Sequence, residues 1–318
     1  MKYVPLGKTT GLKVSELCFG VLSMGPLQAN LNPKEGGLLL KKAYEKGINF
    51  IDTAELYGTY PHIRESLQGI KEEDVIIASK SLASEYKDME QSVTDCLKAL
   101  GRSYIDIFHL HSAKSEADVF EKKSGALQCL LDYKEKGLIR AVGISTHNVD
   151  VVKAAALVPE IDIVYPIINK AGLGIINGTT EDMLQAIRLC KKHDKGLYAM
   201  KVLGGGTLLH SYQEALDFAR GIDGMDSISI GMINEKELHL NLTYFNDLPI
   251  KESMLPECVS GKKVVILQNI CKKCGKCITA CPNNAITITN DIVTVDESRC
   301  LLCGYCHPAC PEFGIRII

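Results

Sequence analysis

The chain has 318 residues, which is enough for one large domain and a second, small one. Hydrophobic residues make up 46% and charged residues 23%, as is usual in globular proteins, and the net charge of −2 argues against a surface for nucleic acid or an anionic membrane. The amino-terminal stretch lacks the apolar core of a signal peptide and no apolar run is long enough to span a membrane, so we expect a cytoplasmic protein.

The first 250 residues alternate short apolar runs with helical patterns. The runs predict strands at 16–20, 48–52, 75–80, 105–111, 139–145, 161–168, 196–201 and 227–231. Helical patterns lie between them, for example at 33–47, 85–101, 180–196 and 234–245, and several end at a glycine, which is a common helix stop. Strands that alternate with helices in this number predict an α/β fold, a (β/α)8 TIM barrel. The alternative is a doubly wound open sheet, whose usual Gly-rich turn GxGxxG is absent here.

Ionisable residues end three consecutive predicted strands. Asp52 ends the second strand, Lys80 the third and His111 the fourth, and Tyr57 follows Asp52 in the next loop. Barrel enzymes place their catalytic groups at the carboxyl ends of the strands, and neighbouring strands lie about 4.8 Å apart, so these side chains can converge. Each residue alone also fits a structural role, such as a helix cap for Asp52 or a core histidine for His111. The four together at one rim favour a catalytic site.

These four residue types suit the reduction of a carbonyl group. A tyrosine hydroxyl has a pKa of about 10 and is too weak an acid at neutral pH without help. A lysine ammonium nearby lowers that pKa, and a carboxylate paired with the lysine keeps it charged and in place. An imidazole then orients the carbonyl oxygen beside the proton donor. We therefore expect Tyr57 to be the donor, assisted by Lys80, Asp52 and His111.

The segments that carry these residues resemble a known family. The stretches "FIDTAELYG" and "IDIFHLH" resemble signatures of the aldo-keto reductases, "VIIASK" is similar to the lysine strand of that family, and the opening "YVPLGKTTGLKVSELCFG" is similar to its amino-terminal hairpin and first strand. The resemblance covers about residues 1–250 and implies a (β/α)8 barrel that reduces aldehydes or ketones reversibly with NADH or NADPH. It also implies that His111 belongs to the catalytic set, whereas His109, two residues earlier, is a packing residue.

The resemblance further implies a set of cofactor-binding residues, but the sequence departs from the family on this side. The expected contacts with the nicotinamide, the pyrophosphate and the adenine are Ser145, Asn169, Lys201, Gly204, Gly205 and Asn241. Thr146, Tyr165 and Met200 replace an asparagine, a glutamine and an aromatic residue that many members carry around the nicotinamide. Glu237 replaces the arginine that often binds the 2′-phosphate of NADPH. The choice between NADH and NADPH therefore stays open.

A linker is expected to follow the barrel. Pro249, Pro256 and Gly261 mark it, and the long carboxyl-terminal loop with which family members close over the substrate is missing. We expect a barrel domain over 1–250, a linker over 251–263 and a cysteine-rich domain over 264–318. Five cysteines outside the last domain receive no role: Cys18, Cys96, Cys129, Cys190 and Cys258.

The carboxyl-terminal segment contains two cysteine runs of identical spacing. "CKKCGKCITACP" begins at Cys271 and "CLLCGYCHPACP" at Cys300, and both read C-x2-C-x2-C-x3-C-P. This is the spacing of bacterial ferredoxins, so we expect a small α+β dicluster ferredoxin domain with two [4Fe–4S] clusters. Structural zinc is the alternative, but zinc ribbons leave the third cysteine of each run unexplained.

The two runs are expected to exchange their last cysteines. In two-cluster ferredoxins the fourth cysteine of each run binds the other cluster. One cluster is then held by Cys271, Cys274, Cys277 and Cys310, and the other by Cys300, Cys303, Cys306 and Cys281. Because so small a domain buries little apolar surface, the clusters are expected to be its main source of stability.

Two classes of function remain open. The first is an oxidoreductase that reduces a small aldehyde or ketone, or oxidises the alcohol, with a nicotinamide cofactor and carries an electron-transfer domain. The second is an electron-transfer or docking protein whose barrel has lost or altered nicotinamide binding and uses a flavin. An external electron-transfer protein is an expected partner. The substrate stays undefined, because the substrate-binding loops match the family least.

Overall fold

The structure, a computed structural model, describes residues 1–255, 263–312 and 314–317. Cys258 and two of the expected boundary residues, Pro256 and Gly261, lie outside these ranges. Eight parallel strands close into a barrel in the order β10-β3-β4-β5-β6-β7-β8-β9. They are β3 (Leu17–Gly20), β4 (Phe50–Asp52), β5 (Ile76–Ser81), β6 (Ile105–His111), β7 (Ile139–Thr146), β8 (Ile163–Pro166), β9 (Gly196–Ala199) and β10 (Ser227–Gly231). The predicted (β/α)8 barrel is confirmed, and the open-sheet alternative is wrong.

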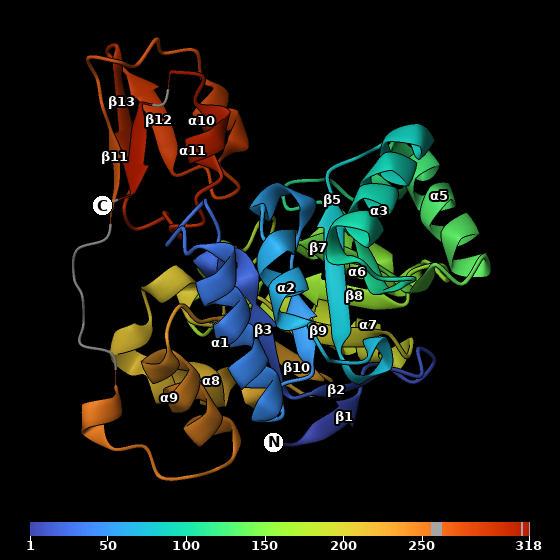
Figure 1. Ribbon diagram of the computed structural model, residues 1–318. Coiled ribbons are helices and arrows are strands. Elements are labelled where there is room, and N and C mark those ends of the chain that lie inside the picture. The colour runs from blue at the N-terminus through green and yellow to red at the C-terminus, as the bar shows by residue number, and fades with distance from the viewer. Residues whose placement is uncertain (256–262, 313, 318) are drawn as a thin grey trace.

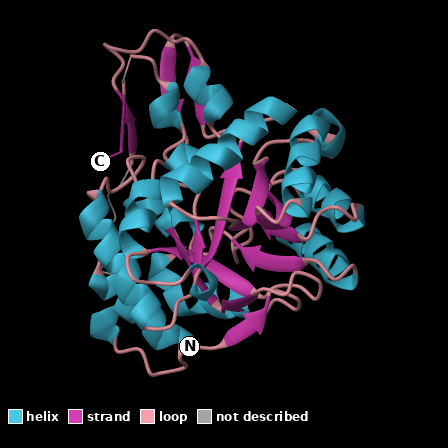
Figure 2. Ribbon diagram, turned by 45° about the vertical axis from the view of Figure 1, so that its right-hand side comes forward, coloured by secondary structure: helices cyan, strands magenta, loops and turns pink. Residues whose placement is uncertain are grey.

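Helices surround these strands (Figures 1 and 2). Local signals explain where several of them begin: the Asn32 side chain accepts a hydrogen bond from the backbone N–H of Glu35 ahead of Pro33, and Thr179 and Asp182 form a capping box. The barrel helices are α1 (Pro33–Glu45), α2 (Tyr60–Ser66), α3 (Tyr86–Leu100), α4 (Val119–Lys122), α5 (Ser124–Glu135), α6 (Val149–Leu157), α7 (Thr180–Lys192), α8 (Tyr212–Arg220) and α9 (Glu235–Phe245).

Short elements close the two ends of the barrel. The antiparallel hairpin of β1 (Tyr3–Pro5) and β2 (Lys13–Ser15) lies at the amino-terminal end of the strands, where its Leu6 packs on Gly196 at the start of β9. Single turns of 3-10 helix occur mainly at the other end: η1 (Val21–Met24), η2 (Glu55–Tyr57), η3 (Glu72–Asp74), η4 (Gly204–Gly206), η5 (Leu209–Ser211) and η6 (Glu252–Met254). Most of these short helical turns thus lie in the loops that follow the carboxyl ends of the strands.

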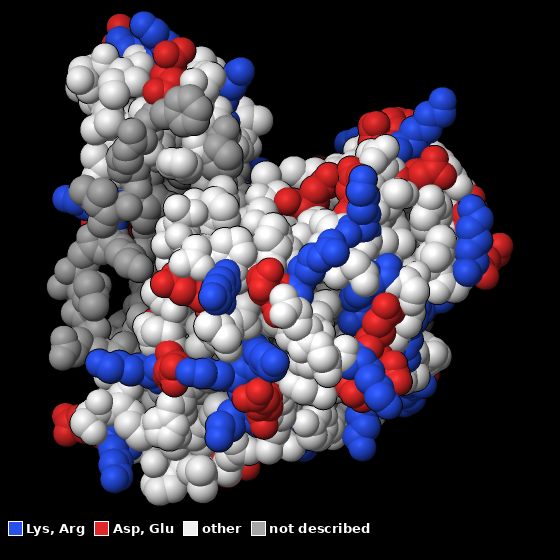
Figure 3. All heavy atoms as spheres, in the orientation of Figure 1, with Lys and Arg blue, Asp and Glu red and all other residues white. Residues whose placement is uncertain are grey.

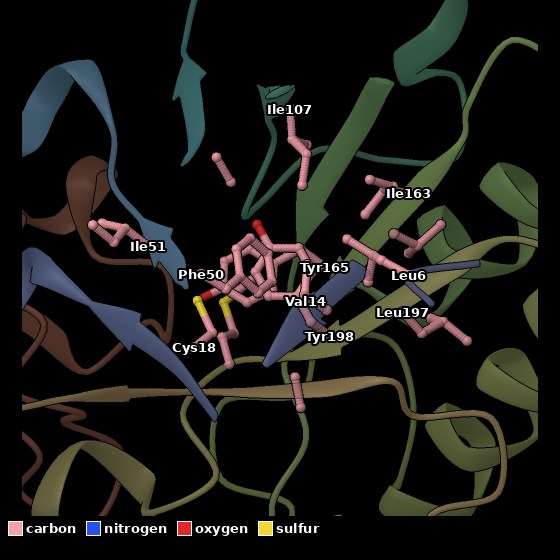
Figure 4. Packing of buried hydrophobic residues seen from close by; sticks show 14 of the residues in the cluster. Leu6, Val14, Cys18, Phe50, Ile51, Ile107, Ile163, Tyr165, Leu197 and Tyr198 are labelled. Carbon is pink, nitrogen blue, oxygen red and sulfur yellow. The ribbon is translucent and has the colours of Figure 1, made fainter. Parts of the chain in front are cut away.

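The barrel interior is filled by side chains. Figure 4 shows Cys18, Phe50, Tyr165 and Tyr198 packed together inside it, and the rings of Tyr165 and Tyr198 stack with centroids 3.9 Å apart. The four barrel cysteines without a role, Cys18, Cys96, Cys129 and Cys190, are all buried, in keeping with packing. The centre of the barrel is therefore a core, and room for a ligand is found at its rim.

The cysteine-rich domain, from β11 to β14, is a small α+β unit (orange and red in Figure 1). Strands β11 (Val264–Ile266) and β14 (Ile315–Ile317) pair antiparallel, as do β12 (Ile286–Thr289) and β13 (Ile292–Val295). Each cysteine run leads into a short helix, α10 (Lys276–Ala280) or α11 (Cys306–Ala309), and then a strand. The domain repeats one structural unit twice, as the duplicated spacing indicates.

The cysteine-rich domain packs on the carboxyl-terminal rim of the barrel, and glycines permit the close approach. A Cβ on Gly205 would lie 2.1 Å from the carbonyl oxygen of Leu301, and a Cβ on Gly304 would lie 2.6 Å from the carbonyl oxygen of Leu27. Lys114 Nζ also donates a hydrogen bond of 3.3 Å to the carbonyl of Thr279. Residues 301–305, which we call the rim segment, therefore face the end of the barrel where catalytic groups are expected.

The surface is mixed in charge. On the face shown in Figure 3, positively and negatively charged side chains are interspersed over the described part of the barrel, in keeping with the small net charge. Among the residues that the structure describes, no helix is both long and apolar enough to cross a membrane.

Candidate active site

Asp52 and Lys80 form a buried ion pair at the ends of neighbouring strands. Lys80 Nζ donates to Asp52 Oδ1 at 2.9 Å, to Asp52 Oδ2 at 2.8 Å and to the carbonyl of Thr53 at 2.7 Å. Burial raises the pKa of Asp52 and lowers the pKa of Lys80, and the charge of each partner opposes the other's shift. Since the ammonium has three oxygen acceptors, we assign the pair its charged form.

Two tyrosines that the sequence analysis did not place here complete the surroundings of Asp52. The Tyr198 hydroxyl donates to Asp52 Oδ1 at 3.0 Å, and the Tyr165 hydroxyl donates to Asp52 Oδ2 at 3.3 Å. Tyr165 thus replaces the family's glutamine with a group that points at the carboxylate. Three donor groups, Lys80, Tyr165 and Tyr198, thus make four hydrogen bonds to Asp52 and hold it, and through it Lys80, in one position.

Tyr57 lies in η2, directly above this pair. It is almost fully buried, and Lys80 Nζ lies 4.8 Å from its ring centroid. Burial raises the pKa of Tyr57 well above its usual range. The net effect is thus opposite to the lowering expected from Lys80, because the cost of burying a phenolate is the largest influence on this pKa. Tyr57 is a protonated hydroxyl at neutral pH.

His111, the last residue of β6, faces Tyr57. The two rings meet edge to face with centroids 6.2 Å apart. Burial, followed by the charge of Lys80, lowers the pKa of His111 well below its usual range, so the imidazole is neutral. The structure thus brings together Asp52, Tyr57, Lys80 and His111, which we call the rim tetrad.

His109 lies deeper and contacts the core. Its Nε2 lies 2.7 Å from the Tyr198 hydroxyl, and a Cβ on Gly143 would lie 2.2 Å from its Nδ1. The neighbouring strand therefore needs a glycine to make room for the imidazole. His109 also lies against the ring of Tyr165, with centroids 6.0 Å apart, and these contacts with buried tyrosines fit its expected packing role.

The rim segment places one side chain inside the site. The Tyr305 hydroxyl lies 3.3 Å from the Tyr57 hydroxyl and 3.1 Å from His111 Nε2. Tyr305 belongs to the second cysteine run, between Cys303 and Cys306. The sequence analysis missed it, because nothing in the run distinguishes a tyrosine that points into another domain from one that packs locally.

A cavity of about 280 Å³ opens beside these groups. Asp52, Tyr57 and His111 line one part of it, and Leu301, Cys303 and Tyr305 contribute a wall from the cysteine-rich domain. The remaining wall contains residues expected at the cofactor or replacing its usual contacts, Ser145, Tyr165, Met200, Lys201, Gly205, Glu237 and Asn241, together with Gly206. The cavity is thus shared between the two domains.

Several residues expected at the cofactor already have partners. Asn169 uses its side chain to hold the loop that follows β8, through Leu173 N–H and C=O, both at 2.9 Å. Asn241 accepts from the Tyr212 hydroxyl at 2.9 Å and donates to the carbonyl of Glu237 at 2.8 Å. Gly205 faces the backbone of Leu301. The side chains of Asn169 and Asn241 and the backbone at Gly205 therefore already make contacts within the protein.

Other expected positions keep features of a binding site. Ser145 lines the cavity. Gly204, Gly205 and Gly206 all adopt left-handed backbone conformations, and Gly205 and Gly206 line the cavity. The backbone N–H groups of Gly204 and Gly206 donate to the carbonyls of Lys201 and Leu203, so this loop offers a dinucleotide room beside Ser145 rather than a full set of donors.

The eight cysteines of the two runs fall into the two crossed sets. Cys271, Cys274, Cys277 and Cys310, the first cysteine set, line one small cavity together. Burial, together with the nearby thiols of Cys303, Cys281 and Cys300, raises the pKa of the Cys306 thiol to about 12. The second cysteine set therefore also lies together.

Backbone groups approach the sulfurs of both sets. Ala285 N–H donates to Cys281 Sγ at 3.3 Å, and Gly314 N–H donates to Cys310 Sγ at 3.2 Å. Among the described residues, no three metal-binding side chains converge as they do around a single ion. A cuboidal cluster instead bonds each thiolate to a different iron, so spaced sulfurs with N–H donors fit it.

Comparisons with known proteins agree with this geometry. Residues 16–248 match the model described as "Aldo/keto reductase family", and residues 270–314 match the one described as "4Fe-4S dicluster domain". The chain is 29% identical over 203 residues to "Probable aldo-keto reductase 1" of Glycine max, covering 54% of this chain and 57% of that protein. It is 25% identical over 182 residues to "D/L-glyceraldehyde reductase" of Hypocrea jecorina, covering 48% and 53%. The chain thus spans about half the length of these relatives.

A solved structure extends the likeness over most of the barrel. A crystal structure assigned to the aldo-keto reductases, from Pseudomonas aeruginosa, superposes with a TM-score of 0.66 at 26% identity. The match covers 77% of this chain and 95% of that one.

Proposed function

The chain belongs to the aldo/keto reductase family, and from that premise we propose that it reduces an aldehyde or ketone to the alcohol with a reduced nicotinamide cofactor. The observation that carries the proposal is the convergence of the rim tetrad at the cavity. The relatives with a stated activity include a glyceraldehyde reductase, which supports a small carbonyl compound as substrate.

Tyr57 is the proton donor in this proposal. A carbonyl oxygen at the point now taken by the Tyr305 hydroxyl would face both the Tyr57 hydroxyl and His111 Nε2. Because burial raises the pKa of Tyr57, the phenol holds its proton until the oxygen gains negative charge. His111 is neutral and donates from Nε2 to hold that oxygen in place.

Lys80 and Asp52 act on Tyr57 rather than on the substrate. When Tyr57 gives up its proton, the phenolate lies over the ammonium of Lys80, 4.8 Å from the ring centroid. Asp52 keeps that ammonium charged and, with Tyr165 and Tyr198, fixed. The tetrad thus offsets charge where it develops in the transition state.

A bound nicotinamide supplies the hydride for the carbonyl carbon. The residues that would hold it are Ser145 at the ring and Gly204, Gly205 and Gly206 at the phosphates. Because Leu301 of the rim segment lies against Gly205, we expect this segment to move when the dinucleotide enters.

The two cysteine sets would hold two [4Fe–4S] clusters, which exchange single electrons. The first set includes the exposed Cys274, whereas three members of the second set, Cys281, Cys303 and Cys306, are buried. Cys303 also lines the cavity at the barrel rim. An external one-electron carrier would therefore meet the first set, and the second set lies beside the barrel site.

This placement also favours a second candidate function. If the barrel binds a flavin instead of a nicotinamide, the chain is an electron-transfer protein in which the cavity beside Cys303 holds the second redox group. Anaerobic titration of the isolated protein with NADH, NADPH and flavin, with bound nucleotide measured after each addition, separates the two candidates.

The test of the proposed reductase is the substitution Tyr57→Phe. We expect NAD(P)H-dependent reduction of small aldehydes to fall roughly 10²- to 10⁴-fold, the usual worth of general acid catalysis. The matched control is Tyr86→Phe, which removes a hydroxyl that donates to Asp132 on the outside of the barrel and leaves the rate unchanged. Near-normal turnover in the Tyr57 variant rejects the proposed role.

A further inference from the structure

One charged group in the cavity has no counterpart. Lys201 lines the cavity, and its Nζ is buried without a hydrogen-bond partner among the described residues. The ring of Tyr305 covers it, with the centroid 5.7 Å from Nζ. A buried ammonium without an acceptor is costly, so a group with negative charge is expected to bind there.

The carboxylates of the cavity are already in use. Asp52 is bound by Lys80, and Glu237 accepts from the backbone N–H of Ile233 at 2.9 Å. The backbone of Lys201 is also held, since its carbonyl accepts from Gly204 N–H at 2.8 Å and its φ is 56°. The loop therefore keeps the ammonium at the cavity, and no acceptor among the described residues forms a hydrogen bond with it.

Lys201 lies near the carbonyl end of the site. After burial, its charge is the next cause that lowers the pKa of His147, and it adds to the effects of burial, Lys80 and Lys123 on the pKa of His111. Tyr305 joins the two places: its hydroxyl contacts Tyr57 and His111, and its ring covers the Lys201 ammonium. A compact ligand that displaces Tyr305 would meet both the proton donor and the cation.

We propose that the substrate is an oxo acid, whose carbonyl oxygen displaces the Tyr305 hydroxyl and whose carboxylate pairs with Lys201. The inference rests on the proposed function for the carbonyl half, and on the unpaired ammonium for the acid half. In the reaction the carbonyl carbon gains the hydride of the nicotinamide and its oxygen gains the Tyr57 proton. The product is a hydroxy acid, and its carboxylate is unchanged.

The test measures binding without turnover, on anaerobic protein with its clusters intact and no nicotinamide present. The probes are glyoxylate and 4-oxobutanoate, each beside a neutral aldehyde of the same chain length, acetaldehyde and butanal, and Kd is measured by calorimetry. We expect Lys201→Met to weaken binding of at least one oxo acid roughly 10- to 100-fold, the worth of a hydrogen bond to a charged group. Lys201→Arg retains most of the affinity, and the neutral aldehydes are unaffected.

Two further variants sharpen the result. Lys170→Met removes a nearby lysine that pairs with Glu214 outside the cavity and leaves oxo-acid binding unchanged. Tyr305→Phe removes the hydroxyl held by Tyr57 and His111, so the ring is displaced more easily and the same oxo acid binds roughly 3- to 10-fold tighter. Electron paramagnetic resonance of the reduced clusters checks that both survive in this variant.

The outcomes separate the inference from the function on which it rests. Tyr57-dependent reduction of butanal together with oxo-acid affinities indifferent to Lys201→Met overturns the inference and leaves the reductase standing. Lys201-dependent oxo-acid binding in a protein that reduces no carbonyl supports the anion site and rejects the reductase. If Lys201→Met weakens NADH and NADPH equally and spares the oxo acids, the lysine serves a cofactor phosphate and the inference is overturned.

Discussion

The substitution Asp52→Asn tests how much the buried ion pair of the rim tetrad contributes to stability. Asp52 accepts two hydrogen bonds from Lys80 and one each from Tyr165 and Tyr198. Asparagine keeps one acceptor oxygen and turns the other into an N–H donor that faces existing donors. The Lys80 side chain, which is 1% exposed, is then left without a counter-charge.

The expected cost follows from this geometry. Removing one partner of a buried ion pair costs roughly 3–5 kcal/mol, because the remaining charge is desolvated and uncompensated. Most domains are stable by about 5–15 kcal/mol, so the variant loses a large share of its free energy of unfolding. The double variant Asp52→Asn/Lys80→Met removes the orphaned charge and is expected to recover at least about 2 kcal/mol of that loss.

The assay is urea unfolding under anaerobic conditions, followed by circular dichroism at 222 nm, which reports mainly the barrel helices. Asp118→Asn, in the exposed pair with Lys122, is the control and leaves the midpoint unchanged. A loss below about 1 kcal/mol in Asp52→Asn, or a double variant no more stable than the single one, would refute the reasoning. Either result would mean that water reaches Lys80 in solution.

Three further predictions concern the cofactors. Cys281→Ser is expected to damage the cluster of the second cysteine set, because the crossed arrangement places the Cys281 sulfur beside Cys306. Site-resolved spectroscopy that finds only the cluster of the first set lost would contradict this prediction. NADPH is expected to bind no tighter than NADH, because Glu237 lines the cavity and its carboxylate would repel a 2′-phosphate. A hundredfold preference for NADPH in fluorescence titrations would overturn this prediction. Anaerobic mixing with excess NADH, without flavin or substrate, is expected to leave the cluster absorbance unchanged, because nicotinamide gives electrons in pairs and a [4Fe–4S] cluster takes them singly; rapid bleaching would reveal an internal path.

The parts of the site that could be predicted from sequence share a local cause. Asp52, Lys80 and His111 each end a strand, and parallel strands of a barrel bring their carboxyl ends to one rim. Tyr57 follows within one short loop of Asp52. The cysteine sets were predicted in a similar way, because the first three cysteines of each run lie close along the chain and the ferredoxin pattern assigns the fourth to the other set.

The parts that could not be predicted depend on contacts between distant segments. Tyr165 and Tyr198 reach Asp52 across the barrel, and the resemblance to the family suggested a glutamine's role for the first of them. Asn169 and Asn241 keep the residue type expected at a cofactor, yet neighbours occupy their amides. Residue identity alone does not say whether a polar side chain faces a ligand or its own loop.

The sequence by itself was enough to predict the barrel, the four residues that meet at its rim and the division of the cysteines into two sets, because periodicity and short spacing lie along the chain. Only the tertiary structure decided that Tyr305 enters the barrel site, since its hydroxyl meets Tyr57 across 248 residues of sequence. The same holds for Lys201, whose ammonium is buried beside the ring of Tyr305 without a hydrogen-bond partner in the described part of the chain. The two domains contact each other where glycines allow their backbones to come close, Gly205 against Leu301 and Gly304 against Leu27. These partners lie far apart in the sequence, so only the folded chain shows that they meet.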